Sequence, residues 1–360
     1  MGKAFILGQK LTSGAEVLFD ERPKERREDL YDREREIDEI KRNVGRPLIL
    51  ITGIRRIGKT SVLKVALNEV DIPAVIVDAR GLRRNYSRAD LYRLIAHGLT
   101  SSLDKLRDLI SGIRGIRVMG LEVELSWRGR DSLSLIELFD KLNERKIIIA
   151  IDEAQRLRGP QSNELKDALA HSYDYNRNIT FILTGSEAGL LHDFVGVEDA
   201  SSPLYGRFYF EVKLDRLSRD QSIDFLSKGF EQLNLRVSEE VLERAYEEFD
   251  GIPGWLTFFG NAYSSGISLE RIKIMAVRTA LEELKNMIRD NPRRYGLVLR
   301  AIAEGKRSWS DIKEYVEERE GSTISSSVLS NIIRNLEDMS VISRYEFLDP
   351  VYREAAKLLP

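Results

Sequence analysis

The stretch Gly53-Ile-Arg-Arg-Ile-Gly-Lys-Thr60 constrains this chain more than any other segment. Its two glycines let the backbone curl so that successive N–H groups point at one spot, which is how a phosphate group is held. A short apolar run at 47–52 precedes the stretch, and apolar residues at helical spacing follow it over 60–68. A glycine loop between a buried strand and a helix is the setting that a phosphate-binding motif requires, so we predict a working phosphate cradle.

The residues of this loop have predictable tasks. Lys59 places a cation on the β- and γ-phosphates of a nucleotide, and Thr60 offers a hydroxyl to Mg²⁺. We expect one of the two loop arginines to contact phosphate or a lid and the other to face solvent. The loop residues expected at the nucleotide, besides Lys59 and Thr60, are Gly53, Arg55, Arg56, Ile57, Gly58 and Ser61.

A second buried strand is predicted at 146–151, and it ends in two acidic residues. The first, Asp152, is placed to hold Mg²⁺, and the second, Glu153, is placed to polarise a water for in-line attack on the γ-phosphate. Two carboxylates can also simply begin a helix, where negative charge is favourable. The neighbouring phosphate loop favours the catalytic interpretation.

Three further strands are predicted at 178–184, 74–78 and 208–212. At the tip of the first of these, Thr184 and Ser186 are candidates to sense the γ-phosphate or position the attacking water, or instead to cap the next helix, and these alternatives stay open. The five strands alternate with helical patterns. This alternation predicts the α/β class, with a doubly wound parallel sheet.

The segment between the predicted strands is less regular. Residues 90–109 have apolar side chains at helical spacing, and residues 116–127 alternate apolar and charged side chains, which predicts a hairpin-like insert. This insert either packs on the edge of the core or docks a partner. The arginine-rich run at 80–88 is expected to be a solvated loop, with contact to phosphate or nucleic acid as the alternative.

Composition excludes several classes of protein. Among 360 residues there is no cysteine, so disulfides, zinc–thiolate sites and thiol nucleophiles are excluded. Lys and Arg number 56 against 58 Asp and Glu, unlike a basic protein that coats nucleic acid. No run of about 18 apolar residues and no signal-peptide layout is present. We therefore expect a cytoplasmic protein without a membrane partner.

The remainder of the chain is predicted to be helical. Helical patterns begin at Ser218 and continue over 239–249 and 269–287. Three further helical segments and a short strand pair at 341–347 then form the pattern of a winged helix, whose third helix is the reader. The outward residues of that helix would be Ser327, Ser330, Asn331, Arg334 and Asn335. The predicted domains are a core with an N-terminal entry segment at 1–214, a helical lid at 215–285 and a winged helix at 286–360.

Several short motifs together resemble those of one family, the archaeal ATPases among the P-loop proteins, within the AAA+/STAND group. The resemblance implies a core that binds ATP or ADP with Mg²⁺, a helical lid and a winged-helix tail. The expectation that the bound base is adenine rather than guanine rests on this resemblance. The matching pieces are the entry box Tyr31–Glu36, the loop Gly53–Ser61, the acidic box Asp152–Gln155, the strand tip Leu183–Ser186, and the segments Ser202–Arg207, Asp250–Gly254 and Asp349–Pro350.

The resemblance also implies roles for residues outside the loop. Tyr31 and Arg33 would lie near the adenine, although a solvated charged helix is the alternative there. Pro253 would contact the base from the lid, although the residues Gly251–Gly254 on their own are typical of a turn. Arg207 would stabilise charge on the γ-phosphate, from its own chain or a neighbour, with a simple salt bridge as the alternative.

The predicted function is Mg²⁺-dependent ATP hydrolysis coupled to motion of the lid and the winged helix. The alternatives are a binding module switched by slow nucleotide turnover and a DNA-binding regulator. The oligomeric state and the client stay open, and we expect a protein partner.

Charge argues against strong non-specific DNA binding by the winged helix. Residues 286–360 contain three Lys and nine Arg against four Asp and eight Glu, so twelve cations face twelve anions. Non-specific binding is driven by many phosphate contacts with counterion release. We therefore expect the isolated domain to bind random duplex DNA with a Kd no tighter than about 10⁻⁴ M at physiological salt.

A salt titration of affinity for random duplex DNA measures this. A Kd near 10⁻⁶ M, with a steep dependence on salt, would contradict the prediction. Sequence-specific binding through Ser327, Asn331 and Arg334 is compatible with it, because contacts with base edges need little net charge.

Overall fold

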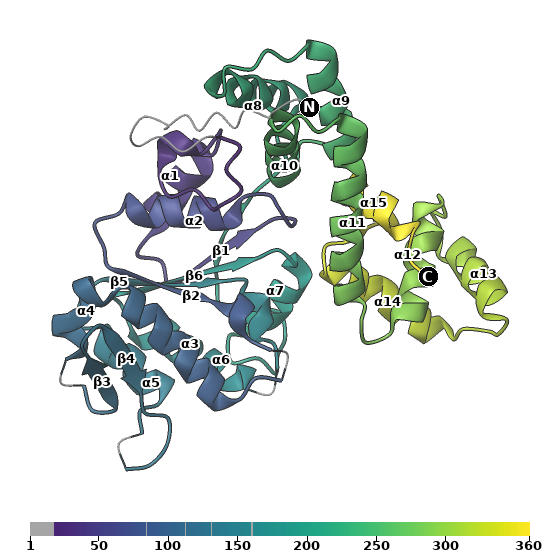
Figure 1. The fold of residues 1–360 in the computed structure, drawn as a ribbon. Coiled ribbons are helices and arrows are strands. Elements are labelled where there is room, and N and C mark those ends of the chain that lie inside the picture. The colour runs from purple at the N-terminus through teal and green to yellow at the C-terminus, as the bar shows by residue number, and fades with distance from the viewer. Residues whose placement is uncertain (1–17, 84, 112, 131, 160) are drawn as a thin grey trace, which may run out of the picture.

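A five-stranded parallel sheet forms the centre of the N-terminal half in this computed structural model, which describes residues 18–360 except 84, 112, 131 and 160 (Figure 1). The strand order is β2-β5-β6-β1-β7, which confirms the predicted α/β class. Residues 1–17 of the predicted entry segment and Arg84 of the arginine-rich run lie outside the described residues. The strands are β1 Leu48–Thr52, β2 Ala74–Asp78, β5 Ile147–Asp152, β6 Ile179–Gly185 and β7 Phe210–Lys213.

Both faces of the sheet are covered by helices. Alternate residues of β1 point into different apolar clusters, Leu48 and Leu50 into one and Ile49 and Ile51 into the other. This explains why the strands read as continuous apolar runs. One face is covered by α1 Glu34–Asn43 and α2 Lys59–Asn68, the other by α3 Arg88–Ser101, α4 Leu103–Ile110, α5 Leu135–Leu142, α6 Ser162–Tyr175 and α7 Ala188–Val195. Short 3₁₀ helices occupy Arg27–Asp29, Ala79–Gly81 and Ala154–Leu157.

The predicted insert is a two-stranded hairpin at the edge of the core. Strands β3 Ile116–Met119 and β4 Glu122–Leu125 pair antiparallel. The backbone N–H of Val123 donates to the hydroxyl of Thr100 at 3.0 Å, which ties the hairpin to α3. The apolar pattern of 90–109 is divided into two helices, because Ser102 leaves helical geometry and its hydroxyl donates to the carbonyl of Ala74 at 2.7 Å.

The C-terminal half is helical, and one long helix, α11, runs from the lid into the winged helix (Figure 1). The winged helix ends in a helix, α15, that the sequence analysis did not predict. Asp349 caps it by accepting from the backbone N–H of Val351 at 2.8 Å, and Pro350 occupies its first turn. The elements are α8 Arg219–Gln232, α9 Glu239–Phe249, α10 Pro253–Ser264, α11 Leu269–Met287, α12 Pro292–Ala303, α13 Trp309–Glu320, α14 Ser326–Asp338, β8 Ile342–Ser343, β9 Glu346–Phe347 and α15 Pro350–Ala356.

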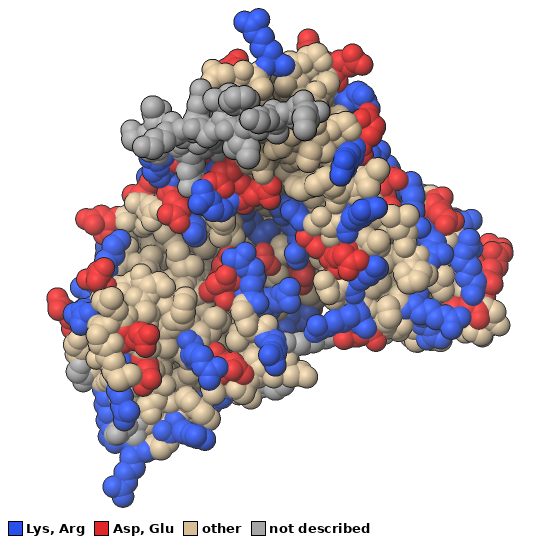
Figure 2. Space-filling model, viewed as in Figure 1, with Lys and Arg blue, Asp and Glu red and all other residues tan. Residues whose placement is uncertain are grey.

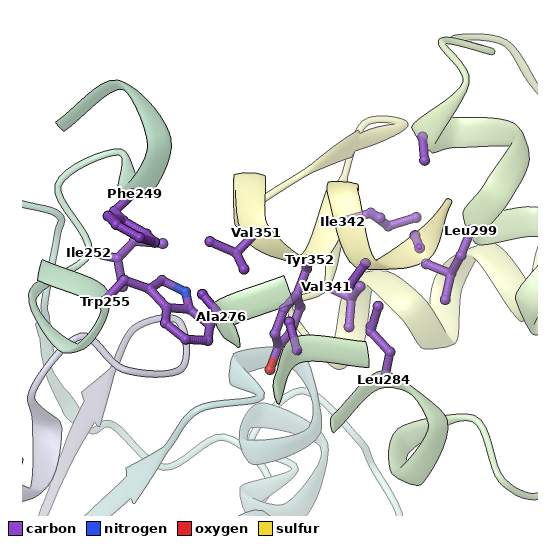
Figure 3. Packing of buried hydrophobic residues seen from close by; sticks show 14 of the residues in the cluster. Phe249, Ile252, Trp255, Ala276, Leu284, Leu299, Val341, Ile342, Val351 and Tyr352 are labelled. Atoms are coloured by element: carbon purple, nitrogen blue, oxygen red, sulfur yellow. The ribbon is translucent and has the colours of Figure 1, made fainter. Parts of the chain in front are cut away.

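The lid and the winged helix share one apolar core (Figure 3). Trp255 from α10, Leu284 from α11, Leu299 from α12 and Tyr352 from α15 all belong to the same buried cluster. Apolar packing is therefore continuous across the predicted boundary at 285/286. No helix among the described residues is long and apolar enough to cross a membrane.

The winged helix also touches the core. The backbone N–H of Ala188, at the start of α7, donates to the hydroxyl of Ser340 at 3.0 Å. A Cβ atom added at Gly189 would lie 2.5 Å from the Cα of Asp338, so only glycine allows this approach between α7 and the end of α14. Of the predicted outward residues of α14, Ser327, Asn331, Arg334 and Asn335 are exposed, and Ser330 is half-buried. Two of the five bond to neighbouring helices of the winged helix, Ser330 to Trp309 and Asn335 to Tyr295.

Candidate nucleotide-binding site

A cavity of about 400 Å³ opens where the carboxyl ends of the strands meet the entry segment and the lid. Ligands of parallel sheets bind at this edge. Gly53 and Asp152 lie at the same place, in contact with residues of the cavity wall. The sequence-predicted residues that line the cavity are Tyr31, Arg33, Arg55, Arg56, Ile57, Gly58, Lys59, Thr60, Ser61, Glu153, Ser186 and Pro253.

A larger cleft of about 1230 Å³ adjoins this cavity on the winged-helix side. Figure 2 shows Lys and Arg side chains along the hollow between the core and the C-terminal half. The two spaces share three lining residues, Arg55, Arg156 and Glu283. Gly58, Lys59 and Thr60 of the phosphate loop line the smaller cavity and not the cleft, so the phosphates are expected in the smaller cavity.

The phosphate loop folds around its lysine. Gly58, at φ +100°, precedes the first turn of α2, where free backbone N–H groups and the helix dipole favour an anion. The ammonium of Lys59 donates to the carbonyls of Gly53 at 2.9 Å and Ile54 at 2.8 Å. Burial lowers the pKa of Lys59 to about 8, against the opposing charges of Glu153 and Asp152.

The corner predicted to hold a metal is built from a carboxylate and two hydroxyls. Thr60 donates to Asp152 at 2.9 Å and Thr184 donates to the other carboxylate oxygen at 2.5 Å. Burial raises the pKa of Asp152, and the guanidinium of Arg80 lies 3.7 Å away. A carboxylate beside a hydroxyl is an oxygen donor set that suits Mg²⁺. Thr184 thus holds Asp152 in place, a contact that the sequence did not predict.

Glu153 is held in place by the residues around it. Its backbone is left-handed, at φ +55°, a conformation that costs on the order of 1–3 kcal/mol for a non-glycine residue. Its carboxylate accepts hydrogen bonds from Ser186 and from the amide of Gln155, both at 2.6 Å. Burial raises the pKa of Glu153, but the charge of Lys59 and these two bonds outweigh it and leave the pKa below its usual value. Ser186 makes no capping bond to α7 and instead orients Glu153.

The end of the cavity away from Glu153 is formed by the entry segment and the lid. Tyr31 packs edge-on against Phe225, with ring centroids 5.4 Å apart, and its hydroxyl donates to Asp224 at 2.6 Å. Arg33 is buried and donates to the carbonyl of Asp215 at 2.8 Å, where the chain enters the lid. Pro253, in the first turn of α10, faces the same space. An aromatic and apolar wall of this kind suits a nucleotide base.

Both loop arginines are bound to the lid. Arg56 contacts the carboxylate of Glu283, on α11, at 2.7 Å, and Arg55 lies 3.4 Å from the same carboxylate. Their side chains are 26 % and 32 % exposed, respectively. The expectation that one of them faces solvent is therefore wrong, because α11 brings a carboxylate within reach of both.

Arg207 lies away from the phosphate loop of its own chain. It pairs with Asp174, near the end of α6, at 2.6 Å. It also precedes β7 by three residues, whereas the phosphate loop follows β1. Because β1 and β7 are parallel, Arg207 lies at the amino ends of the strands and the phosphate loop lies at their carboxyl ends. The salt bridge weighed as the alternative is what this chain forms, and a catalytic role within the same chain does not fit this geometry.

Sequence reasoning missed several residues in and beside the cavity. Gln155 lines the adjoining cleft and bonds to Glu153, although its place in the acidic box could have indicated this. Arg80 lies in the arginine-rich run, where a solvated loop was expected, yet it reaches Asp152. Phe225 and Thr257 come from lid helices, where no local pattern distinguishes a base-facing residue from a core residue.

The profile of a family described as an ATPase domain predominantly from Archaea matches residues 30–259. The chain belongs to this family. A second profile, described as the MCM protein C-terminal winged helix-turn-helix domain, matches residues 290–354. The family resemblance inferred from the motifs is thus confirmed. These matches show an ATPase domain followed by a winged-helix domain.

The solved structure of the Walker-type ATPase PABY2304 of Pyrococcus abyssi is similar over nearly the whole chain. It is 37% identical, with a TM-score of 0.81, and the alignment covers 95% of this chain and 100% of that chain. A mutant RuvB of Thermotoga maritima is 13% identical, with a TM-score of 0.45, over 89% of this chain and 92% of that chain. DnaA of Aquifex aeolicus, bound to AMPPCP, is 14% identical, with a TM-score of 0.42, over 88% and 92%. No curated protein matches the chain.

The lowered pKa of Lys59 predicts a pH-dependent affinity for ATP. Bound phosphate favours the charged ammonium, so the pKa of Lys59 is higher in the complex than in the free protein. Affinity should therefore be level below pH about 8 and fall above it, by up to about tenfold per pH unit. Titration calorimetry between pH 6.5 and 9.5 measures this. Phosphate monoesters lose their last proton near pH 6, so the ligand itself does not titrate in the upper part of this range.

The control is Lys59→Ala, which should abolish ATP binding at every pH while circular dichroism shows that the fold survives. An ATP affinity equal to that of the wild type in this variant would contradict the assignment of the loop.

Proposed function

We propose that this protein is a Mg²⁺-dependent ATPase that hydrolyses ATP in the cavity between the core, the entry segment and the lid. One observation carries the proposal. Lys59, Asp152 and Glu153 meet at the carboxyl edge of the sheet, with Thr60 bonded to Asp152 and Ser186 bonded to Glu153. Cation, metal-binding carboxylate and general base are the parts that phosphoryl transfer to water requires.

Glu153 is the proposed general base. Its lowered pKa keeps the carboxylate ionised near neutral pH, so that it can accept a proton from a water that attacks the γ-phosphate. Ser186 and Gln155 fix the orientation of this carboxylate. Lys59 and the N-terminus of α2 supply positive charge at the phosphates.

Thr60 and Asp152 are the residues that would hold Mg²⁺. The ion would neutralise charge on the phosphate oxygens when it is bound. Arg80, near Asp152, limits the negative charge of this corner.

We propose further that the nucleotide state is coupled to the lid and the winged helix. Two contacts support the coupling. Glu283 of α11 contacts the loop arginine Arg56. Ala188, two residues after Ser186, bonds to Ser340 of the winged helix. If the γ-phosphate displaces Glu153 and Ser186, the backbone at Ala188 would move with them, and its bond to Ser340 would transmit the movement to the winged helix.

Replacing Glu153 tests the proposed base. Glu153→Gln should keep ATP affinity and lose turnover on the order of 10²-fold or more, because an amide cannot accept the proton of the water. Steady-state phosphate release and single-turnover hydrolysis measure the loss. They also distinguish this proposal from a slow nucleotide switch, in which wild-type turnover itself is negligible.

Glu187→Gln is the matched control, because Glu187 is a neighbouring, half-buried carboxyl whose pKa is raised by partial burial. That variant should retain most of the turnover. Normal turnover in Glu153→Gln, with a loss in Glu187→Gln, would move the role of base to Glu187.

Arg207 is proposed to act on the γ-phosphate of a neighbouring chain, because its own chain places it at the opposite edge of the sheet. Arg207→Ala should then slow hydrolysis more than it weakens binding. Mixing Arg207→Ala with Lys59→Ala protein should restore part of the activity. In such a mixture, the intact Arg207 of a Lys59→Ala chain can reach the intact phosphate loop of an Arg207→Ala chain.

Arg177→Ala is the control for this experiment, because Arg177 is an exposed arginine just before β6, at the same edge of the sheet. It should leave turnover unchanged. If Arg207→Ala also leaves turnover unchanged, or if the mixed sample never regains activity while both proteins fold, Arg207 is not a catalytic residue in a neighbouring site.

A further inference from the structure

Five side chains connect the phosphate loop to the C-terminal helix in a closed circuit of contacts, which we call the Arg56 ring. Its members are Arg56, Trp255, Asp349, Tyr352 and Glu283. They come from the phosphate loop, from α10 and α11 of the lid, and from the start of α15. Thus residues almost 300 positions apart in the sequence meet beside the proposed nucleotide site.

The first half of the ring runs through a tryptophan. The guanidinium of Arg56 lies over the indole of Trp255, 4.0 Å from its centroid, a distance at which a cation and an aromatic face attract. The indole N–H donates to Asp349 at 2.8 Å. Trp255 is fully buried and Asp349 is 5 % exposed, so this hydrogen bond is shielded from water.

The second half of the ring runs through a tyrosine. Asp349 accepts from the backbone N–H groups at the start of α15 and so fixes the position of Tyr352. The hydroxyl of Tyr352 donates to one oxygen of Glu283, and the other oxygen of Glu283 contacts Arg56 at 2.7 Å. The ring is thereby closed. Tyr352 is 3 % exposed and lies in the apolar core that the lid and the winged helix share (Figure 3).

The backbone of Arg56 is held as firmly as its side chain. Arg56 adopts φ +63°, a left-handed conformation that is unfavourable for a residue with a side chain. Its carbonyl accepts from the backbone N–H of Gly254 at 2.9 Å. A Cβ atom at Gly254 would lie 2.6 Å from the Cβ of Arg56, so a larger residue would force the two segments apart. The loop needs external contacts to keep Arg56 in this conformation.

We infer that the Arg56 ring positions the phosphate loop for nucleotide, and that Tyr352, Glu283 and Asp349 are positioning residues for phosphate binding although they lie outside the core. Opening the ring frees Arg56 to leave its left-handed conformation. Backbone N–H groups of the loop then lose their common direction, and the affinity for the phosphates falls. This inference rests on the proposed function, because it concerns the same site.

Tyr352→Phe is the sharpest test, because it removes one hydroxyl and leaves the apolar contacts of the ring in place. We expect it to weaken ADP and ATP binding about tenfold, the scale of a hydrogen bond to a charged group. KM should rise by a similar factor while kcat changes less than about twofold, because Tyr352 does not contact Glu153. Calorimetry with ADP and steady-state hydrolysis measure the two effects.

Tyr315→Phe is the matched control. Tyr315 is likewise a tyrosine of the winged helix, and its hydroxyl donates to Glu304 at 2.7 Å, but neither of these residues lines the cavity. Both variants lose a tyrosine–glutamate hydrogen bond, so their thermal stabilities should fall by similar amounts. Only Tyr352→Phe should lose nucleotide affinity. Equal affinities in the two variants, or tighter binding in Tyr352→Phe, would overturn the inference.

A double-mutant cycle distinguishes positioning through Arg56 from a general loss of structure. Tyr352→Phe should weaken ADP binding in the wild type and have little further effect in the Arg56→Ala variant, because the ring is already open there. Full additivity of the two losses would overturn the inference. Failure of the wild type itself to bind ADP would instead reject the proposed function, so the two failures are distinguishable.

Discussion

Three charged groups, Lys59, Asp152 and Glu153, lie within or beside the buried edge of an apolar sheet, and the surrounding structure compensates for their burial. An unpaired charge in such a place is costly, so each group needs partners. Carbonyls of the phosphate loop accept from Lys59, and two threonine hydroxyls donate to Asp152. These polar partners come from the loop after β1, the first turn of α2 and the end of β6, so burial of the charges requires these three segments to meet.

The lid completes the site from outside the sheet. Its contribution is partly apolar, through Phe225 and Pro253, and partly electrostatic, through Glu283. One carboxylate neutralises two arginines that would otherwise repel each other in the phosphate loop. Because Glu283 lies on α11, which continues into the apolar core of the winged helix, the position of the loop depends on the packing of the whole C-terminal half.

The winged helix contacts the rest of the molecule through α15 against α11, through the bond from Trp255 of α10 to Asp349, and through the end of α14 against α7. The domain carries as many anions as cations, so we expect it to have no strong electrostatic attraction to DNA of random sequence. The side chains of Ser327, Asn331, Arg334 and Asn335 on α14 are exposed.

The sequence by itself determined the sheet, the phosphate loop and the acidic strand end, because these depend on local patterns. A continuous apolar run predicts a buried strand, and the glycine spacing predicts the curl of the loop. In a parallel sheet, the carboxyl ends of the strands share one edge, so the convergence of Thr60, Asp152 and Ser186 followed from the fold class. The hairpin was recognised for the same reason, from alternation around one glycine.

Only the tertiary structure decided the partners of the arginines. Arg55, Arg56 and Arg207 are alike in sequence terms, yet the first two face Glu283 and the third faces Asp174. Which carboxylate a guanidinium reaches depends on the packing of helices that are distant in the chain, and no local pattern records that packing. The same holds for Trp255 and Tyr352, which read as ordinary core residues. The indole N–H of Trp255 and the hydroxyl of Tyr352 find their hydrogen-bond partners only because α10, α11 and α15 meet beside the phosphate loop.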